Sequence, residues 1–310
     1  MRTYDSIPSL QQDTSVALGL FDGLHRGHQQ VVSKAVSHDE EMIPTVFSFD
    51  YDNPSLISKP DFKALLSPTL KIRLLERLGV SQFICPPFSS IKNLPASRFL
   101  EEILENALQA KAVFCGYDYR FGKNAEGDTG MLRDFCASHG IYYEVLPALT
   151  EGGAPISSTR IRTCIRSGQM EEAQALLGYP YTIDFIVSEG RKLGRRLGFP
   201  TINQPYPAGN VLPRFGVYAS LAQIDGKSYM GVTNIGVKPT VGDGNAPAAE
   251  TFVIGYKGEL YGRQVPLSLI HFVRPEQKFT SIEDLKEQIA RDTQEVVRIL
   301  QNSAEHSALF

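Results

Sequence analysis

Short apolar runs alternate with amphipathic segments over the first half of the chain. The runs have the length of buried strands, and the segments between them carry apolar residues at helical spacing. This pattern predicts strands at 16–20, 44–49, 80–85, 112–115 and 141–146, and helices at 27–35, 68–79, 97–110, 131–139 and 161–167. Strands that alternate with helices form βαβ units, so we expect a doubly wound, parallel α/β sheet.

The pattern changes after residue 178, where strand-like runs follow one another with glycine-rich turns between them. The predicted strands are 182–187, 216–223, 229–233, 251–254 and 264–272. With few helical segments among them, they predict a small antiparallel β-barrel. The amphipathic segment 281–301 predicts a C-terminal helix that Ser281 and Asp284 begin. We therefore expect two domains, 1–178 and 179–310.

Composition narrows the class of protein. Of the 310 residues, 42% are hydrophobic and 21% charged, as in soluble globular proteins. A net charge of −3 argues against a nucleic-acid partner. No apolar run reaches the length of about 18 residues that a membrane span requires, and the N-terminus lacks a signal-peptide core. Four scattered cysteines without a C-x-x-C pair indicate reduced thiols, so we expect a cytoplasmic protein.

A glycine-rich turn with two histidines follows the first predicted strand. Its residues are Gly19, Phe21, Asp22, Gly23, His25, Gly27 and His28. The spacing of the histidines places both imidazoles on one face of the next helix. Unpaired N–H groups at the helix start, which glycines leave accessible, favour a phosphate. We therefore predict chemistry at a nucleotide α-phosphate, with the imidazoles stabilising developing charge.

Two structural alternatives apply to this turn. The histidines could be surface residues of a capped helix, but the whole string G-x-F-D-G-x-H-x-G-H after a strand is more specific than H-x-x-H alone. A zinc site would need further histidine or cysteine ligands nearby, and the sequence offers no such cluster.

Two further segments carry residues suited to nucleotides. The loop 116–122 follows the fourth predicted strand and holds Asp118, Tyr119 and Phe121, whose aromatic rings can stack on a planar ligand. The segment 156–162 reads I-S-S-T-R-I-R, in which Ser158, Thr159 and Arg162 can cap a helix and bind phosphate. Taken alone, each segment is as well explained by packing or by capping.

A basic, glycine-punctuated segment opens the second domain. It contains Gly190, Gly194, Arg195 and Gly198, and backbone N–H groups and cations of such loops hold polyphosphate. Thr201 and Asn203 offer oxygen ligands for Mg²⁺. The segment lacks the G-x-x-x-x-G-K-[ST] pattern, so it is not a P-loop.

In their order along the chain these motifs resemble the bacterial bifunctional riboflavin kinase/FMN adenylyltransferase family. The resemblance rests on the H-x-G-H turn of the nucleotidyltransferase superfamily, on I-S-S-T-x-I-R, on G-R-x-L-G-F-P-T-x-N at 194–203, and on N-I-G-x-K-P-T at 234–240. It covers about residues 15–300. It implies that the second domain converts riboflavin and ATP to FMN, and that the first converts FMN and ATP to FAD and pyrophosphate, both with Mg²⁺.

The resemblance also implies roles for single residues. His25 and His28 would stabilise the adenylyl-transfer transition state, while Ser158, Thr159 and Arg162 hold phosphates. The loop 116–122 would contact flavin through Asp118, Tyr119 and Phe121, and Arg274 would contact flavin or ADP. Glu250 lies where the family places a general base for the ribityl 5′-hydroxyl.

Two departures from the family pattern leave alternatives open. The family's T-F-x-P-H-P segment is replaced by the acidic residues 49–54, and Ile202 replaces the usual alanine beside the metal ligands. One alternative is a chain in which only the kinase domain is active. The other is a flavin-binding regulator without activity, although such a protein has no need of His25, His28 and Glu250.

Overall fold

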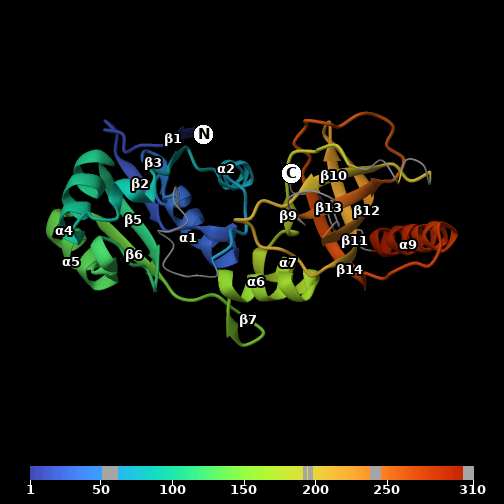
Figure 1. Ribbon diagram of the computed structural model, residues 1–310. Coiled ribbons are helices and arrows are strands. Elements are labelled where there is room, and N and C mark those ends of the chain that lie inside the picture. The colour runs from blue at the N-terminus through green and yellow to red at the C-terminus, as the bar shows by residue number, and fades with distance from the viewer. Residues whose placement is uncertain (51–61, 191–193, 195–197, 238–245, 303–310) are drawn as a thin grey trace. The chain divides into compact units, whose positions relative to one another are not determined.

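The computed structural model describes residues 1–50, 62–190, 194, 198–237 and 246–302 (Figure 1). Contacts divide the chain into two compact units. The first comprises Met1–Phe62 and Pro68–Ser157, and the second comprises Lys63–Ser67 and Ser158–Phe310. Contacts thus place α6 (Ser158–Ser167) and α7 (Met170–Leu177) in the second unit, whereas the predicted domain boundary follows them. That these two helices belong to the first domain stays a prediction.

The first unit contains a six-stranded parallel sheet in the order β1-β4-β3-β2-β5-β6. Its strands are β1 (Arg2–Tyr4), β2 (Thr14–Leu18), β3 (Ile43–Phe47), β4 (Gln82–Ile84), β5 (Ala110–Gly116) and β6 (Tyr142–Leu146). The five predicted strands are confirmed, and the additional β1 is too short to leave a pattern. From β2 the chain builds outward through β3 and β4, then crosses back to β5. The sheet therefore has its topological switch point between β2 and β5.

Helices connect these strands as predicted. The main ones are α1 (Arg26–Ser37), α2 (Pro68–Arg77) and α5 (Thr129–His139), with the short α3 (Phe88–Ile91) and α4 (Ala96–Arg98). Pro68 begins α2 and Gly79 follows it with a left-handed φ of 89°, as the sequence indicated. The predicted helix 97–110 forms, but most of it is a π-helix, η3 (Phe99–Ala107). Short 3₁₀ turns, η1 (Asp22–Leu24) and η4 (Lys123–Ala125), and the hairpin β7 (Thr150–Glu151) and β8 (Ala154–Pro155) complete the unit.

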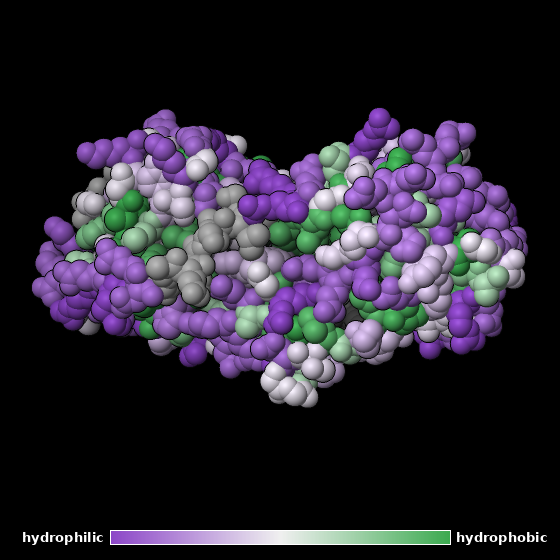
Figure 2. Space-filling view, turned by 180° about the vertical axis from the view of Figure 1, so that it is seen from behind, coloured by the Kyte–Doolittle hydropathy of each residue, from purple (hydrophilic) through white to green (hydrophobic). Residues whose placement is uncertain are grey.

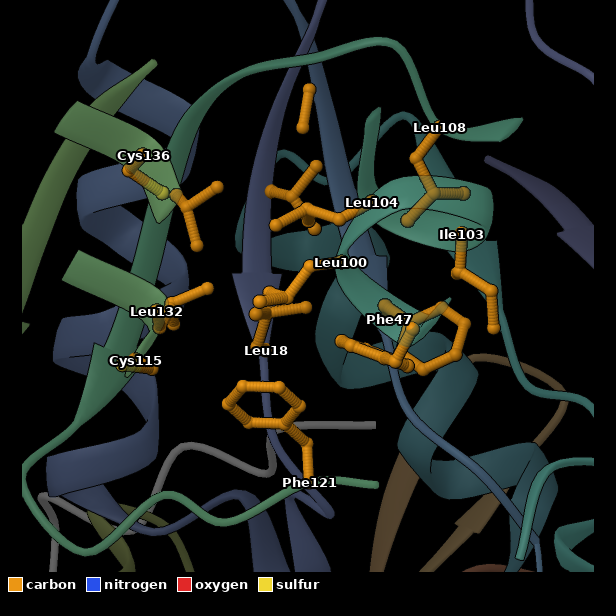
Figure 3. Packing of buried hydrophobic residues seen from close by; sticks show 14 of the residues in the cluster. Leu18, Phe47, Leu100, Ile103, Leu104, Leu108, Cys115, Phe121, Leu132 and Cys136 are labelled. Carbon is orange, nitrogen blue, oxygen red and sulfur yellow. The ribbon is translucent and has the colours of Figure 1, made fainter. Parts of the chain in front are cut away.

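An apolar core lies between the sheet of the first unit and the segments α4, η3 and α5. Figure 3 shows Leu18 of β2 facing Leu100 and Leu104 of η3, with Phe121 beside them. Burying one leucine side chain contributes about 2 kcal/mol, so this contact fixes η3 on the sheet. Cys115 and Cys136 lie in the same core, and burial raises the pKa of the Cys115 thiol to about 12. Their inert, buried state agrees with the prediction of structural thiols.

The second unit contains a curled antiparallel sheet in the order β10-β13-β12-β11-β14-β9. Its strands are β9 (Thr182–Ile183), β10 (Thr201–Pro205), β11 (Gly216–Ile224), β12 (Lys227–Val237), β13 (Pro247–Val253) and β14 (Leu267–Pro275). Beyond β9 the chain forms one bridge to Gln264, near β14, and another from Ser188 to Asn203 on β10. These bridges link the two edge regions and curl the sheet.

The predicted C-terminal helix is confirmed as α9 (Ile282–Asn302). Val296 and Leu300 of this helix pack against Val217 and Val232 of the sheet. Its start is capped by Ser281, whose Oγ accepts a hydrogen bond from the Asp284 N–H at 3.0 Å. One strand was missed: residues 201–203 were interpreted as part of a loop, but they lie on β10.

The surface is mixed. Hydrophilic side chains cover most of the face in Figure 2, and hydrophobic ones lie in separate patches. In the described ranges, no helix combines the length and the apolar character that crossing a membrane requires.

Candidate functional sites

The histidine motif lies at the switch point of the parallel sheet, where ligands of such sheets bind. Gly19 follows β2, and Phe21 adopts a left-handed φ of 51° before the turn η1. A β-carbon on Gly19 would lie 3.0 Å from the Phe21 ring, so a larger residue there would have to displace that ring by a few tenths of an ångström. Left-handed backbone at a non-glycine residue costs about 1 kcal/mol or more, and such strain is concentrated at functional sites. The strained backbone therefore indicates that this turn has a functional role.

His25 and His28 form a stacked pair. Their ring centroids lie 3.6 Å apart with 15° between the planes, and Phe21 meets the His28 ring edge-on at 5.4 Å. His25 is the N-cap of α1, and its Nδ1 accepts the His28 backbone N–H at 3.3 Å. A β-carbon on Gly27 would lie 3.3 Å from the His25 ring. The expectation that both imidazoles share one face is confirmed.

Both imidazoles are neutral at pH 7. Burial lowers the pKa of His25 to about 4. Burial also lowers the pKa of His28 well below its usual 6.5, and the nearby charges of His25 and Lys71 act in the same direction. Because His25 Nδ1 accepts a hydrogen bond, the neutral ring carries its proton on Nε2. The His28 Nδ1 is buried and has no hydrogen-bond partner in the described part of the chain. The pair can thus donate N–H groups to an anion.

The aromatic loop follows β5 at the same edge of the sheet, because Leu18 of β2 pairs with Cys115 of β5. Asp118 is exposed there. Tyr119 and Phe121 point elsewhere: their ring centroids stack at 5.8 Å, and the Phe121 ring packs at 5.2 Å from that of Phe99 in the core. The exposed aromatic ring is that of Tyr117, 55% exposed, which sequence reasoning did not single out.

The hydroxyl and arginine motif lies on α6, in the second unit. Ser158 and Thr159 occupy its first turn. Arg162 is buried, and its Nε donates to the Lys63 carbonyl at 2.7 Å. The structure therefore shows a helix start with hydroxyls and an anchored guanidinium. That these residues meet the histidines at one nucleotide stays a prediction.

In the second unit, strand register aligns three polar side chains in one row. Asn203 of β10 pairs with Glu250 of β13, and Glu250 pairs with Asn234 of β12. All three are half-buried. The Asn203 amide donates to Ser188 Oγ at 3.0 Å, and the Asn234 amide lies 3.5 Å from a Glu276 carboxylate oxygen. The predicted base and a predicted metal ligand are thus neighbours. Asn234, the first residue of the N-I-G-x-K-P-T motif, lies beside them, although no role was predicted for it from the sequence.

The other site residues predicted for the second unit differ in exposure, and some of them lie outside the described residues. A β-carbon on Gly194 would lie 2.3 Å from the Phe199 carbonyl oxygen, so this turn requires glycine. Gly190 and Gly198 flank it, and Gly198 has a left-handed φ of 89°. Thr201 is exposed at the start of β10. Arg195, the acidic segment after Asp50, and Lys238–Thr240 of the N-I-G-x-K-P-T motif lie outside the described residues.

Arg274 has a structural partner. Its Nε and Nη2 donate to the Asp292 carboxylate at 2.9 and 2.7 Å, and Asp292 is buried on α9. This bidentate pair ties β14 to the C-terminal helix. Contact of Arg274 with flavin stays a prediction.

The chain thus combines a parallel unit that carries paired histidines with an antiparallel unit that carries a row of one carboxylate and two carboxamides. Family models agree with this division: residues 7–160 match "FAD synthetase" and residues 177–300 match "Riboflavin kinase". The chain is 33% identical to a "Bifunctional riboflavin kinase/FMN adenylyltransferase" of Listeria monocytogenes, covering 90% of each chain. It is 34% identical to the Bacillus subtilis protein of the same name, covering 94% of each. The chain belongs to the family of bifunctional riboflavin kinase/FMN adenylyltransferases.

A solved structure is similar over nearly the whole chain. The "Macrolide-efflux Protein" from Streptococcus pneumoniae is 28% identical, with a TM-score of 0.84 over 96% of this chain and 99% of that one. The two chains therefore share the order of both units. The name belongs to that protein, and the family models and curated relatives carry the functional conclusion here.

Proposed function

We propose that the two units divide the synthesis of FAD between them. The second unit phosphorylates riboflavin with ATP to give FMN, and the first unit transfers the adenylyl group of a second ATP to FMN. The observation that carries the first assignment is the neutral, stacked His25–His28 pair at the switch point. The observation that carries the second is the row of Asn203, Glu250 and Asn234.

In the first unit an FMN phosphate oxygen attacks the α-phosphorus of ATP, and the bond to the bridging oxygen breaks to release pyrophosphate. The Nε2–H of His25 and an N–H of His28 donate to the oxygens on which charge develops. Gly23 and Gly27 let these oxygens approach the backbone of the turn. Asp118 and its loop seat the flavin, and Ser158, Thr159 and Arg162 bind the ATP phosphates.

In the second unit Glu250 takes the proton of the ribityl 5′-hydroxyl as this oxygen attacks the γ-phosphorus of ATP. The glycine turn with Gly190, Gly194 and Gly198 holds the phosphates. Among the described residues no cluster of three or more His, Cys, Asp or Glu side chains could hold a metal. The proposed ligands are instead the Thr201 hydroxyl and the Asn203 carboxamide oxygen, whose donor type suits Mg²⁺. Bound Mg²⁺ neutralises phosphate charge.

This assignment places a soluble biosynthetic enzyme in the cytoplasm, where riboflavin, FMN and ATP are its small-molecule partners. Three of the four free cysteines are buried, which is consistent with a reducing compartment.

The test is a time course with purified protein, riboflavin, ATP and Mg²⁺, in which the flavins are separated by chromatography. FMN should appear first and FAD after it. FMN alone would favour the kinase-only alternative and direct attention to the acidic segment at 49–54. Bound riboflavin without either product would favour the regulator and contradict both assignments.

A further inference from the structure

We propose that Lys71 binds the pyrophosphate portion of ATP at the adenylyl-transfer site, as the cation that the two neutral histidines lack. This inference rests on the function proposed for the first unit. Lys71 lies inside the amphipathic helix α2, well away in sequence from the histidine motif, and nothing in its local pattern distinguishes it from a surface lysine.

The position of Lys71 is fixed by the histidine turn itself. Its Nζ donates to the Leu20 carbonyl at 3.2 Å, and the Ser48 hydroxyl donates to the same oxygen at 2.9 Å. Leu20 lies between the end of β2 and Phe21. The lysine therefore reaches from α2 to the carboxyl edge of the sheet, where the histidine motif begins.

The surroundings of Lys71 leave its charge uncompensated. The ammonium is half-buried, and in the described ranges it makes no ion pair. The charge of Lys71 lowers the pKa of His28 and that of Cys85, and Asp50 also acts on Cys85. Neither His28 nor Cys85 is ionised at pH 7, because burial lowers the histidine pKa and raises the thiol pKa to about 11. A partly desolvated cation beside neutral donors favours an anionic ligand.

A second observation at the same place points to a ligand. The His28 Nδ1 is buried without a hydrogen-bond partner among the described residues. Buried polar atoms are nearly always satisfied, so an orphaned one beside an uncompensated cation indicates a group that binds between them. A phosphate oxygen satisfies both, because it accepts hydrogen bonds and carries negative charge.

The chemistry of the reaction places Lys71 beside the leaving group, pyrophosphate. When the FMN oxygen bonds to the α-phosphorus, the bond from that phosphorus to the bridging oxygen breaks, and its electron pair goes to pyrophosphate. Neutral imidazoles can donate hydrogen bonds to these oxygens but supply no charge. The Lys71 ammonium neutralises the departing anion by its charge, and the step requires no proton transfer.

The experiment compares Lys71→Met and Lys71→Arg with Arg73→Met, an exposed residue of the same helix. FAD formation from FMN and ATP and FMN formation from riboflavin and ATP are measured for each variant. For Lys71→Met we expect kcat/KM for ATP in FAD formation to fall on the order of 10²-fold, with FMN formation unchanged. Lys71→Arg should recover most of the loss because it keeps the charge, and Arg73→Met should lie within about twofold of the unsubstituted protein.

Pyrophosphate binding separates a ligand contact from a structural role. Product inhibition of FAD formation by pyrophosphate should weaken on the order of tenfold in Lys71→Met and stay unchanged in Arg73→Met. Full FAD formation in Lys71→Met, or unchanged inhibition by pyrophosphate, would overturn the proposal while leaving the function of the unit intact. Equal losses in Lys71→Met and Lys71→Arg, with lowered melting temperatures, would also overturn it. Absence of FAD formation in the unsubstituted protein would instead contradict the proposed function.

Discussion

The two candidate sites are built in different ways. At the switch point of the first unit, Gly19, Phe21, His25 and His28 come from one short stretch, and the backbone of that stretch sets their geometry. In the second unit Asn203, Asn234 and Glu250 come from three strands, and cross-strand register brings them together. Local conformation thus fixes the histidine pair, whereas strand pairing fixes the row of the second unit. Substitutions of His28 and of Glu250 should therefore separate the two activities, because the histidine pair and the Asn203–Glu250–Asn234 row have no residue in common.

The largest effect is expected at Glu250, in the row that it forms with Asn203 and Asn234. Glu250→Gln keeps the size of the side chain but removes the base, so FMN formation should fall on the order of 10³-fold. FAD formation from added FMN should be unchanged. Rates of both steps are measured by flavin chromatography, with the exposed Glu259→Gln as a matched control. Unaltered FMN formation in Glu250→Gln would show that another group accepts the proton.

The mirror experiment removes one imidazole from the stacked pair. His28→Asn should lower FAD formation from FMN by about 10² to 10³-fold, since it removes a donor aimed at developing charge. FMN formation should stay at its original rate. His139→Gln, an exposed histidine on α5, is the control. If His28→Asn forms FAD as fast as the control His139→Gln does, the histidine pair is a packing feature and not part of the reaction.

The third prediction concerns pH and stability. Unfolded His25 titrates near 6.5, whereas folded His25 stays neutral down to about 4. As pH falls, the unfolded chain takes up this proton first, so the free energy of unfolding decreases between about pH 6.5 and pH 4. The pKa difference corresponds to a loss of about 3 kcal/mol. His25→Asn, which preserves a good N-cap, should lack this share of the loss.

Urea unfolding of the original protein and of His25→Asn at several pH values between 4 and 7 measures that difference. The two stabilities should converge as the solution becomes more acidic. Parallel curves across this range would mean that His25 takes up its proton at the same pH in the folded and the unfolded chain, and the argument from a lowered pKa would be lost.

The smallest effect is expected from a single methyl group. Gly27→Ala places a β-carbon 3.3 Å from the His25 ring, which must shift by a few tenths of an ångström. FAD formation should fall about tenfold because reacting groups lose alignment. The melting temperature should not fall, since alanine favours the helix over glycine by about 1 kcal/mol. Gly209→Ala, where no atom lies within 4 Å, is the control. A Gly27→Ala variant with full activity would show that the stacking distance is not critical.

Sequence predicted the features whose cause is local. The turn between β2 and α1 is determined by consecutive residues, and apolar runs in the sequence indicate the strands of the parallel sheet. The strand β10 was missed because its first residues complete a glycine-rich basic segment that resembles a loop. What makes residues 201–203 a strand is pairing with β13, which lies far along the chain.

Side-chain placement was harder to predict than element type. Tyr117, Tyr119 and Phe121 alternate in one loop, and their pattern gives no sign that the first is exposed while the last packs on Phe99. No role was predicted for Asn234 or Lys71 for the same reason. A site role for either depends on which residue of another element lies opposite, and one sequence does not contain that information.

The most direct test of the account uses the variants His28→Asn and Glu250→Gln. Each variant is incubated with riboflavin and, in a separate reaction, with FMN, always with ATP and Mg²⁺, and the flavins are followed over time. The account predicts that His28→Asn converts riboflavin to FMN and stops there. Glu250→Gln should convert FMN to FAD but leave riboflavin unchanged. Loss of both reactions in either variant would contradict the division of the two steps between two independent sites.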